Sequence, residues 1–273
     1  MNKSVPLSEF IQSNPLLETQ NLSRYFGGLR AVDGVNFQLK QGHFHSIIGP
    51  NGAGKTTFLN LISGALKPTH GRVIYKGQDI TDFPAHRMAH LGIARSYQIT
   101  NLFTTLTVLE NVRLAAQALG DDNFRLFTHY KRYHHYEQRA EKVLERVGLA
   151  SLASAPVISL SHGDKRRLEL AMLLSQDPDV LLLDEPTAGL ATEQVPEFMA
   201  LVKEVREQGN KTIVLVEHNM SVVMTLSHRI SVMHQGRILA EGTPREISAN
   251  ETVQSAYLGT LYEDTNELGG TDR

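Results

Sequence analysis

Apolar and polar positions follow two different periods along this chain, one typical of strands and the other typical of helices. Residues 34–40, GVNFQLK, alternate with period two, and residues 43–49, HFHSIIG, end in an apolar pair before glycine. Residues 55–64, KTTFLNLISG, have apolar side chains at helical spacing and end at a glycine. The pattern therefore predicts two strands, a glycine-rich loop and a helix in succession.

Two later segments are almost continuously apolar, which indicates strands that are buried on both faces. They are residues 180–185, VLLLDE, and residues 211–218, KTIVLVEH, and helical patterns flank both. Such strands are typical of a parallel sheet with helices on each side. Residues 229–244 then predict a hairpin with a tight turn at Gln235 and Gly236, and a final helix is predicted over residues 245–259.

A helical region interrupts this α/β pattern. Amphipathic helices are predicted over residues 106–119 and 136–149, each with one apolar face. The stretch FRLFTHYKRYHHY separates them, and we interpret its basic residues 129–136 as a solvated surface rather than a lipid or nucleic-acid contact. The predicted organisation is an N-terminal extension (1–14), one α/β domain (15–262) with a helical lobe at about 100–165, and a polar tail (263–273).

Composition and charge narrow the class of protein. The chain has 273 residues, of which 41% are hydrophobic, so it is long enough to fill a core. Its 27 Lys and Arg residues nearly balance its 29 Asp and Glu residues, which argues against a surface built to bind nucleic acid. The lack of cysteine excludes disulfides and thiol nucleophiles. The N-terminal sequence lacks a signal peptide, and no stretch approaches the roughly 20 apolar residues that span a bilayer, so a cytoplasmic protein is expected.

Residues 49–56, GPNGAGKT, match the G-x-x-x-x-G-K-[ST] phosphate loop. The glycines let backbone N–H groups converge on phosphate oxygens, and the helix that starts at Lys55 directs its positive end to the same place. Lys55 would neutralise the β and γ phosphates, and Thr56 would supply a hydroxyl to Mg²⁺. The candidate nucleotide-binding residues are Gly49, Pro50, Asn51, Gly52, Ala53, Gly54, Lys55, Thr56 and Thr57.

Two adjacent carboxylates end the apolar run at 180–185. Asp184 and Glu185 are expected to point to opposite faces of the strand. Asp184 would then join the Mg²⁺ shell, and Glu185 would act as general base on a water in line with the γ-phosphate. The other apolar strand delivers His218 at its end, as a γ-phosphate sensor. Alone, the acidic pair would be a solvated turn and the histidine a capping residue, but the phosphate loop favours the catalytic interpretation.

Together these residues resemble the nucleotide-binding subunits of ATP-binding cassette (ABC) transporters over nearly the whole chain. The family's motifs occur in the family's order: Walker A at 49–56, a Q-loop at SYQITNLF with Gln98, a signature segment LSHGDKRRLELAM from Leu160, Walker B at 180–185 and the switch His218. The resemblance implies an α/β P-loop fold of ABC type, with an antiparallel β subdomain and a helical subdomain.

The resemblance also implies a chemistry. It is the hydrolysis of ATP with Mg²⁺, in which Lys55 offsets phosphate charge and Gln98 both contacts the metal and reads the γ-phosphate. An aromatic residue upstream stacks on adenine in this family, and Phe26 in SRYFGGLRAV is the candidate, with Tyr25 as the fallback. The alternative is that both aromatic side chains only pack in the core.

The signature segment has physical features of its own. Ser161 and Gly163 precede a run with helical spacing, so Ser161 is a predicted N-cap and the amides after it would attract an anion. The family resemblance implies that this anion is the ATP of a second cassette. Ser161 and Gly163 are therefore candidate ATP ligands in a head-to-tail dimer with two ATP molecules, formed by two copies or by a heterodimer.

Two departures from the family pattern bear on this segment. His162 replaces the first glycine of the usual LSGGQ, and Asp164 replaces its glutamine. A carboxylate here would repel ATP, so the Asp164 side chain is expected to point away, although an acidic residue is favourable in the first turn of a helix. The usual D-loop SALD reads AGLA, with Ala191 at the aspartate position, which puts side-chain coupling there in doubt and leaves backbone coupling open.

Longer segments, among them FGGLRAVDGVNF and VEHNMSVVMTLSHRISVMHQGRILAEGTP, are similar to the ATPase subunits of branched-chain amino acid importers and their urea and amide relatives. The resemblance implies a peripheral protein on the cytoplasmic face of the inner membrane. Its partners would be membrane permease subunits, a second ABC ATPase subunit and, indirectly, a periplasmic solute-binding protein, with no nucleic acid. A soluble ABC ATPase that acts on nucleic acid or ribosomes is the alternative.

A permease helix would dock on residues 98–109. Leu102, Phe103 and Leu106 form an apolar cluster in this predicted loop, which normally needs covering. The alternative is that these side chains pack beneath the helical lobe.

Overall fold

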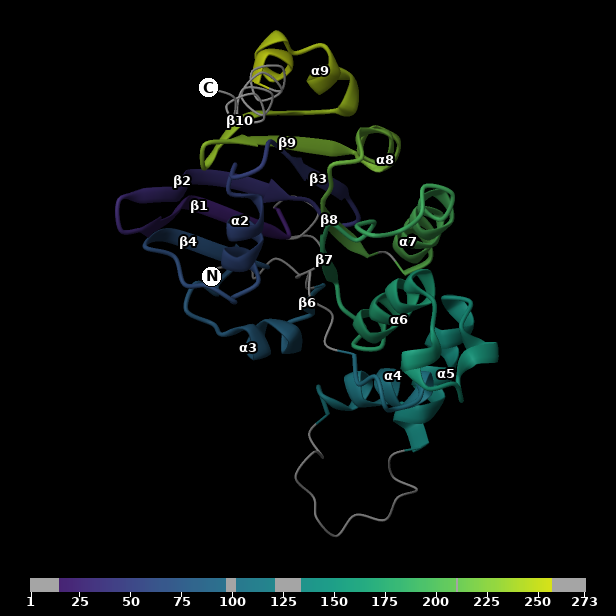
Figure 1. The fold of residues 1–273 in the computed structure, drawn as a ribbon. Coiled ribbons are helices and arrows are strands. Elements are labelled where there is room, and N and C mark those ends of the chain that lie inside the picture. Colours follow the sequence, from purple (N-terminus) through teal and green to yellow (C-terminus); the bar gives the residue numbers. More distant parts are fainter. Residues whose placement is uncertain (1–14, 97–101, 121–133, 210, 257–273) are drawn as a thin grey trace, which may run out of the picture. The chain divides into compact units, whose positions relative to one another are not determined.

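The computed structural model describes residues 15–96, 102–120, 134–209 and 211–256 (Figure 1). The chain divides into two compact units. Unit 1 contains the described residues up to Pro84 and from Thr212 onward, and unit 2 contains those from Ala85 to Lys211. Within the described ranges, no helix has the length and apolar character needed to cross a membrane.

Unit 1 is rich in strands and begins and ends the described chain. Its elements are β1 (Leu17–Phe26), β2 (Leu29–Leu39), β3 (Phe44–Ile48), α2 (Lys55–Ile62), β4 (His70–Tyr75), β5 (Gln78–Asp79), β8 (Thr212–Val216), α8 (Met220–Leu226), β9 (Arg229–His234), β10 (Arg237–Gly242) and α9 (Pro244–Ser248).

The strands of unit 1 form two groups. An antiparallel sheet has the order β2-β1-β4-β5, as the resemblance implied. In the second group β3 pairs in parallel with both β8 and β9, and β10 pairs antiparallel with β9. The predicted hairpin turn is confirmed, since Gln235 and Gly236 have φ values of +48° and +78°, as a two-residue turn of this kind requires.

Burial in unit 1 follows the hydrophobic pattern. Every residue of β8 is buried, which confirms the prediction of a strand covered on both faces, and every residue of β3 is buried as well. The predicted apolar face of β2 is also confirmed, because Val35, Phe37 and Leu39 are buried.

Unit 2 contains most of the helices. Its elements are α3 (Ala85–His90), β6 (Ile93–Arg95), α4 (Val108–Gln117), α5 (His134–Arg146), two short 3₁₀ helices (Ala150–Leu152 and Val157–Ser159), α6 (His162–Leu174), β7 (Val180–Asp184) and α7 (Val195–Gly209).

Helices α4, α5 and α6 pack against one another in unit 2 (Figure 1). The two amphipathic helices predicted from the sequence are confirmed, with Val112 of α4 and Ala140 and Leu144 of α5 buried. Helix α4 starts with a capping box in which Thr107 and Glu110 each bond the backbone N–H of the other. Strand β7 is entirely buried and runs parallel to β6.

Two of the differences from the sequence-based expectation have a clear physical reason. The predicted helix over 245–259 is interrupted, because α9 ends at Ser248 and a new helical segment covers residues 251–256. Between them the Asn250 side chain accepts a hydrogen bond from the Val253 N–H, which caps the second segment. Strand β1 was not predicted, since register shifts along its pairing with β2 break the alternation.

Candidate functional site

The phosphate loop connects β3 to α2 in unit 1. Gly54 is the N-cap residue of α2, and the first turn of this helix contains no acidic residue. Lys55 is buried, and its Nζ donates hydrogen bonds to the carbonyl oxygens of Gly49 and Pro50 at 2.8 and 2.9 Å. The loop therefore wraps around an ammonium group next to the N-terminal amides of α2, which is a suitable environment for a phosphate group.

Glycine is required in this loop by the surrounding backbone as well as by any phosphate. Gly49 and Gly54 have φ values of +154° and +99°. A Cβ at Gly49 would collide with the carbonyl oxygen of Met233, and one at Gly54 would collide with that of Ala31. The loop is thus held closely against β2 and β9, in a backbone conformation that side chains disfavour.

Phe26 and Tyr25, the two candidates for adenine stacking, lie at the end of β1 in different environments. Tyr25 donates its hydroxyl hydrogen bond to Asp33 at 2.8 Å, which ties it to β2. Phe26 is 46% exposed, and the guanidinium carbon of Arg24 lies 4.7 Å from the centre of its ring. Of the two rings, Phe26 is the one accessible for stacking.

The Asp33 carboxylate accepts hydrogen bonds from other side chains besides Tyr25. Arg237 of β10 donates to Asp33 through Nε and Nη2 at 3.1 and 2.7 Å. The hydrogen bonds from Arg237 and then Tyr25 lower the pKa of Asp33 to about 2. Asp33 therefore stays ionised at neutral pH and links β2 to β10 beside Tyr25.

His218 follows the carboxyl end of β8, next to the strand that leads into the phosphate loop. Strands β3 and β8 are parallel neighbours, with Ile47 opposite Val216. His218 is exposed, and its backbone N–H donates to the buried carboxylate of Glu217 at 3.1 Å. Sequence analysis did not assign a role to Glu217, which here positions the backbone that presents His218.

Asp184 ends β7 in unit 2 and is paired with a basic residue. Arg95, the last residue of β6, donates to Asp184 Oδ2 at 3.1 Å, and both side chains are buried. Arg95 was not predicted as a site residue, although an arginine that ends the short apolar segment GIAR was a usable signal. The pair neutralises the carboxylate that is the candidate Mg²⁺ ligand.

Glu185 lies just outside β7, which corrects one prediction. Strand alternation does not extend to Glu185, because β7 ends at Asp184 and Glu185 adopts a φ of +49°. A non-glycine residue in this region is uncommon and costs of order 1 kcal/mol or more, so it persists only where other contacts hold it. The Glu185 carbonyl accepts the Ala188 N–H at 3.0 Å, and we call residues 185–188 the Glu185 turn.

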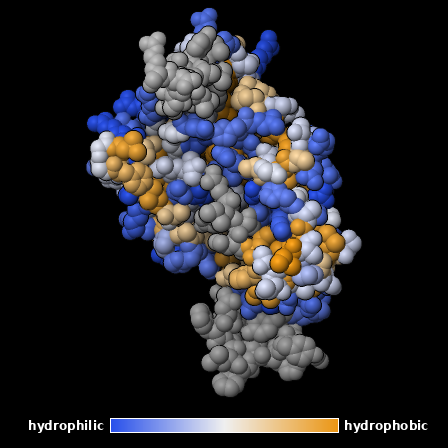
Figure 2. All heavy atoms as spheres, viewed as in Figure 1, coloured by the Kyte–Doolittle hydropathy of each residue, from blue (hydrophilic) through white to orange (hydrophobic). Residues whose placement is uncertain are grey.

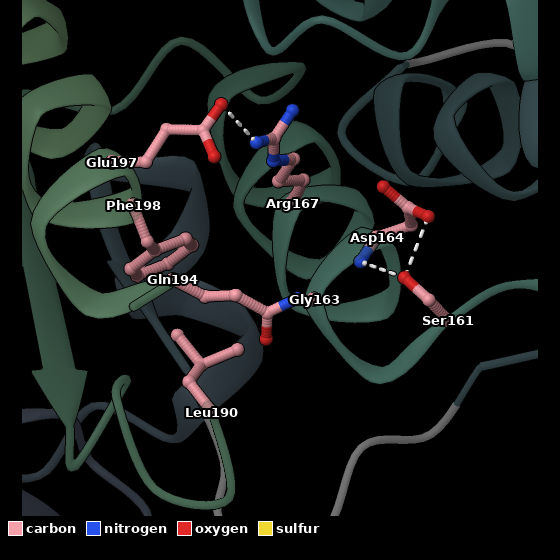
Figure 3. A pocket seen from close by; sticks show the side chains of 8 residues that line it. All are labelled: Ser161, Gly163, Asp164, Arg167, Leu190, Gln194, Glu197 and Phe198. Carbon is pink, nitrogen blue, oxygen red and sulfur yellow. Dashed lines mark hydrogen bonds and ion pairs between the residues drawn. The ribbon is translucent and has the colours of Figure 1, made fainter. Parts of the chain in front are cut away.

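The signature segment caps α6, as predicted. Ser161 is the N-cap, and its hydroxyl oxygen accepts the Asp164 N–H at 3.1 Å. The expectation that Asp164 points away is wrong: the Ser161 hydroxyl donates to Asp164 Oδ2 at 2.6 Å, and the two side chains face each other (Figure 3). The acidic side chain folds back because it can then bond the N-cap and lie at the positive end of the helix.

A pocket lies beside this N-terminus, entirely within unit 2 (Figure 3). Its lining residues are Ser161, Gly163, Asp164, Arg167, Leu190, Gln194, Glu197 and Phe198. Arg167 and Glu197 form an ion pair of 2.6 Å at one side of it. The pocket is therefore polar and contains both signs of charge near the two residues that the resemblance assigned to ATP.

The predicted docking segment is described from Leu102 onward, and Gln98 lies outside the described residues. Leu102 and Leu106 are half-buried, whereas Phe103 is 54% exposed. The buried side chain of Asn111 accepts the Phe103 N–H at 2.9 Å and donates to the Phe103 carbonyl at 3.1 Å. Asn111, which sequence analysis did not single out, thus presents Phe103 outward.

A second apolar side chain is exposed next to this segment. Ile158 is also exposed, and its N–H donates to the Thr104 carbonyl at 3.0 Å. Apolar side chains gather over the helices of unit 2 (Figure 2). Phe103 and Ile158 thus give this part of unit 2 an exposed apolar surface.

Comparisons with known proteins agree on one family. The sequence profile described as "ABC transporter" matches residues 32–188, and the profile described as "Branched-chain amino acid ATP-binding cassette transporter" matches residues 237–262. The chain is 41% identical to the high-affinity branched-chain amino acid transport ATP-binding protein LivG of Escherichia coli K12, over 90% of this chain and 99% of that protein.

Solved structures give the same result for the fold. A nucleotide-free ATP-binding cassette from an ABC transporter is 29% identical, with a TM-score of 0.77 over 89% of this chain and 98% of that one. A dimeric ATP-binding cassette in a post-hydrolysis state with ADP and Pi is 30% identical, with a TM-score of 0.71 over 84% of this chain and 99% of that one.

Proposed function

Because the chain belongs to the ABC transporter family of ATP-binding subunits, we propose that it is the ATP-hydrolysing subunit of an ABC importer. The importer takes up branched-chain amino acids or related small solutes such as urea and amides, through partner permeases. The observation that carries this proposal is the 41% identity to LivG over 90% of the chain. The match of residues 237–262 to the branched-chain amino acid cassette profile supports the same solute class.

ABC ATPase domains bind ATP, and the phosphate loop is the proposed place for its β and γ phosphates. Lys55 leaves the carbonyls of Gly49 and Pro50 to bond phosphate oxygens, and the N–H groups of the loop surround them. The adenine stacks on the exposed ring of Phe26. Ser161 and Gly163 bind the γ-phosphate of the ATP held by the other cassette.

The residues present fit a Mg²⁺ ion that arrives with ATP. Thr56 would provide a hydroxyl and Asp184 a carboxylate, the hard oxygen donors that Mg²⁺ prefers, and Gln98 would add an amide oxygen. Among the described residues no cluster of three or more His, Asp or Glu side chains could hold a metal by itself. Mg²⁺ takes few protein ligands and completes its octahedral shell with phosphate oxygens and water. When bound, Mg²⁺ neutralises phosphate charge.

Hydrolysis depends on side chains that act on the attacking water and the γ-phosphate. Glu185 accepts a proton from the attacking water and orients it toward the γ-phosphate. His218 and Gln98 contact the γ-phosphate and distinguish ATP from ADP. The buried Glu217 carboxylate accepts the backbone N–H of His218 and so holds the backbone that carries the imidazole.

Family members of this type pair with membrane permeases and form dimers, and one structural relative is described as dimeric with ADP and Pi. We propose that this chain lies on the cytoplasmic face of the inner membrane, where Phe103 contacts a permease helix. ATP closes two cassettes face to face, and hydrolysis opens them and resets the permease. A periplasmic solute-binding protein delivers the solute. An ABC ATPase that acts on nucleic acid is not favoured, since LivG is a transport protein.

Reconstitution tests this proposal. The chain is co-expressed with the permeases and solute-binding protein encoded beside it, and the complex is placed in liposomes. ATP hydrolysis is then measured with the binding protein loaded with leucine, urea or a short amide. We expect hydrolysis and uptake that one of these solutes stimulates. A chain that does not associate with permeases, or a complex that does not hydrolyse ATP, would disprove the proposal.

A further inference from the structure

The signature helix and the Glu185 turn meet at the carbonyl group of Ala188. Arg166 of α6 donates to the Ala188 oxygen from Nη2 at 3.0 Å, and His162 Nε2 lies 3.5 Å from the same oxygen. A carbonyl oxygen only accepts hydrogen bonds, so His162 donates from Nε2. One backbone oxygen thus receives two side chains of the signature segment.

The other side of Ala188 leads directly to Glu185. The Ala188 N–H donates to the Glu185 carbonyl at 3.0 Å, which closes the Glu185 turn. Glu185 has a φ of +49°, so its backbone depends on contacts such as this one to keep its conformation. A continuous set of hydrogen bonds therefore runs from His162 and Arg166, through Ala188, to the residue proposed as general base.

Two departures from the family pattern fit each other in space. His162 stands at a glycine of the usual LSGGQ, and Gly189 stands at the alanine of the usual SALD. A Cβ at Gly189 would lie 2.7 Å from His162 Nε2, closer than non-bonded atoms approach. Gly189 also has a φ of +79°, which glycine adopts without cost. The glycine therefore makes the space that the imidazole occupies.

We propose that His162 and Arg166 are positioning residues that link the signature segment to Glu185 through Ala188. This inference rests on the proposed function, in which the γ-phosphate of the second cassette's ATP binds at Ser161 and Gly163. His162 lies between these two residues, so phosphate binding acts on the first turn of α6 and, through Ala188, on the Glu185 backbone. This backbone route performs the coupling that the missing D-loop aspartate at Ala191 cannot provide.

Arg166 is oriented for this role by a second partner. Its Nη1 donates to Glu169 at 2.9 Å, one turn along α6, and both side chains are largely buried. The guanidinium is therefore fixed at one end by α6 itself and bonds Ala188 at the other. Such an anchored group can transmit a small displacement of the helix N-terminus to the turn.

Four variants of the permease-bound complex test the link: His162→Gly, His162→Gln, Gly189→Ala and the double variant His162→Gly/Gly189→Ala. We expect His162→Gly to lower the kcat of ATP hydrolysis about fivefold, the size associated with the loss of one hydrogen bond, with little change in KM. His162→Gln, whose amide can donate to Ala188, should recover most of the rate. Gly189→Ala should lower kcat at least as much, because the methyl displaces the imidazole.

The double variant shows whether the two substitutions disrupt the same contact or lower kcat independently of each other. If His162 and Gly189 act through one contact, the double variant is no slower than Gly189→Ala alone. Losses that multiply, or an unchanged kcat in His162→Gly, would overturn the link. His134→Gly is the matched control, since His134 is likewise the first residue of a helix and is exposed, and its kcat should equal that of the wild type.

The same experiment distinguishes this inference from the proposed function. A wild-type complex that does not hydrolyse ATP removes the proposed function and the link with it. A wild-type complex that hydrolyses ATP while His162→Gly does so equally fast removes only the link. Thermal unfolding of each variant is recorded in parallel, and a fall in kcat that His162→Gln does not reverse would assign His162 a purely structural role.

Discussion

Arg95 and Asp184 form an ion pair of 3.1 Å whose side chains are only 5% and 1% exposed. Asp184 is the candidate Mg²⁺ ligand, so this pair compensates a buried carboxylate at the centre of the proposed catalytic machinery. Removal of one partner of a buried pair costs more than the pair contributes, because the remaining charge stays in a poorly solvated environment.

Arg95→Met is therefore expected to destabilise the protein by about 3–5 kcal/mol. Urea unfolding followed by circular dichroism measures the free energy of unfolding. Arg95→Met/Asp184→Asn is the control, and it should recover part of the loss because neither charge of the pair remains buried without its partner. An Arg95→Met protein within about 1 kcal/mol of the wild type, the range of an exposed ion pair, would contradict this account.

Asp164→Gln is expected to have opposite effects on stability and on ATP binding. The carboxylate favours the N-terminus of α6, so its loss should lower the free energy of unfolding by about 0.3–1 kcal/mol. The Ser161 hydroxyl, which now donates to Asp164, would become available to a phosphate. ATP-dependent dimerisation, measured by analytical ultracentrifugation, should therefore need less ATP.

Asp164→Asn is the matched control for this change, since it removes the charge and keeps the size. It should also promote ATP-dependent dimerisation, because the repulsion between the carboxylate and phosphate is gone. Weaker dimerisation in both variants would mean that the carboxylate assists ATP binding, against our expectation.

Glu185→Gln should trap the ATP-bound dimer, because glutamine keeps the shape but cannot accept the proton of water. We expect hydrolysis to fall by at least two orders of magnitude, which is the usual contribution of a general base. Phosphate release and size-exclusion chromatography in ATP measure the two effects. Glu193→Gln, an exposed residue nearby in the sequence, is the control and should turn over normally. Rapid turnover by Glu185→Gln would exclude Glu185 as the base.

Phe103→Asp is expected to uncouple transport while it spares ATP binding. A carboxylate at this exposed position should prevent apolar contact with a permease helix. Solute uptake by liposomes and binding of a fluorescent ATP analogue to the free chain provide the two measurements. Leu239→Asp, at a partly exposed apolar residue of unit 1, is the control and should leave uptake unchanged. Normal uptake by Phe103→Asp would refute the docking surface.

The protein should lose stability as the pH falls from about 6.5 to about 4, in part because of His45. Burial lowers the pKa of His45 to about 4. The charge of Glu241 raises this pKa, whereas the charges of Arg229 and His43 lower it further. In this window the unfolded chain binds a proton at His45 that the folded chain does not, so folding becomes less favourable. The stability that depends on neutral His45 is fully present above the pKa of the unfolded chain, about 6.5, and is lost progressively as the pH falls toward 4.

The expected loss from this one group is about 2 kcal/mol between pH 7 and pH 5. Urea unfolding at several pH values measures it, and His45→Gln is the control that should show a shallower dependence on pH. The Ser231 hydroxyl bonds Glu241 at 2.7 Å, so His45 donates from Nε2 to Ser231 at 2.8 Å, a bond that glutamine can also donate. Equal pH dependence in both proteins would contradict the prediction.

The motifs of this protein could be identified from the sequence because each depends on residue types at fixed spacing. The phosphate loop requires glycines before Lys55, and the buried strands require unbroken apolar runs before Asp184 and His218. Helices α4 and α5 were predicted from their apolar faces for the same reason. Each of these patterns involves residues that are close together in the sequence, so it can be recognised without knowledge of tertiary contacts.

The pairing of distant residues was decided only by the tertiary structure. Nothing near Asp184 in the sequence indicates that Arg95, 89 positions away, neutralises it. Nor does the sequence indicate that Asp164 turns back to Ser161, because strand and helix periodicity says nothing about which rotamer a polar side chain adopts. The positive φ of Glu185 was missed because alternation applies only within a strand.

The sequence by itself thus determined the family, the fold class and the identity of the candidate nucleotide ligands. Only the tertiary structure decided how the groups of unit 2 act on one another: Arg95 on Asp184, and His162 with Arg166 on Ala188. The physical reason is that hydrogen bonds and burial depend on three-dimensional distance. Folding brings residues that are far apart in the sequence within hydrogen-bonding distance, and these contacts determine their ion pairs and backbone conformations.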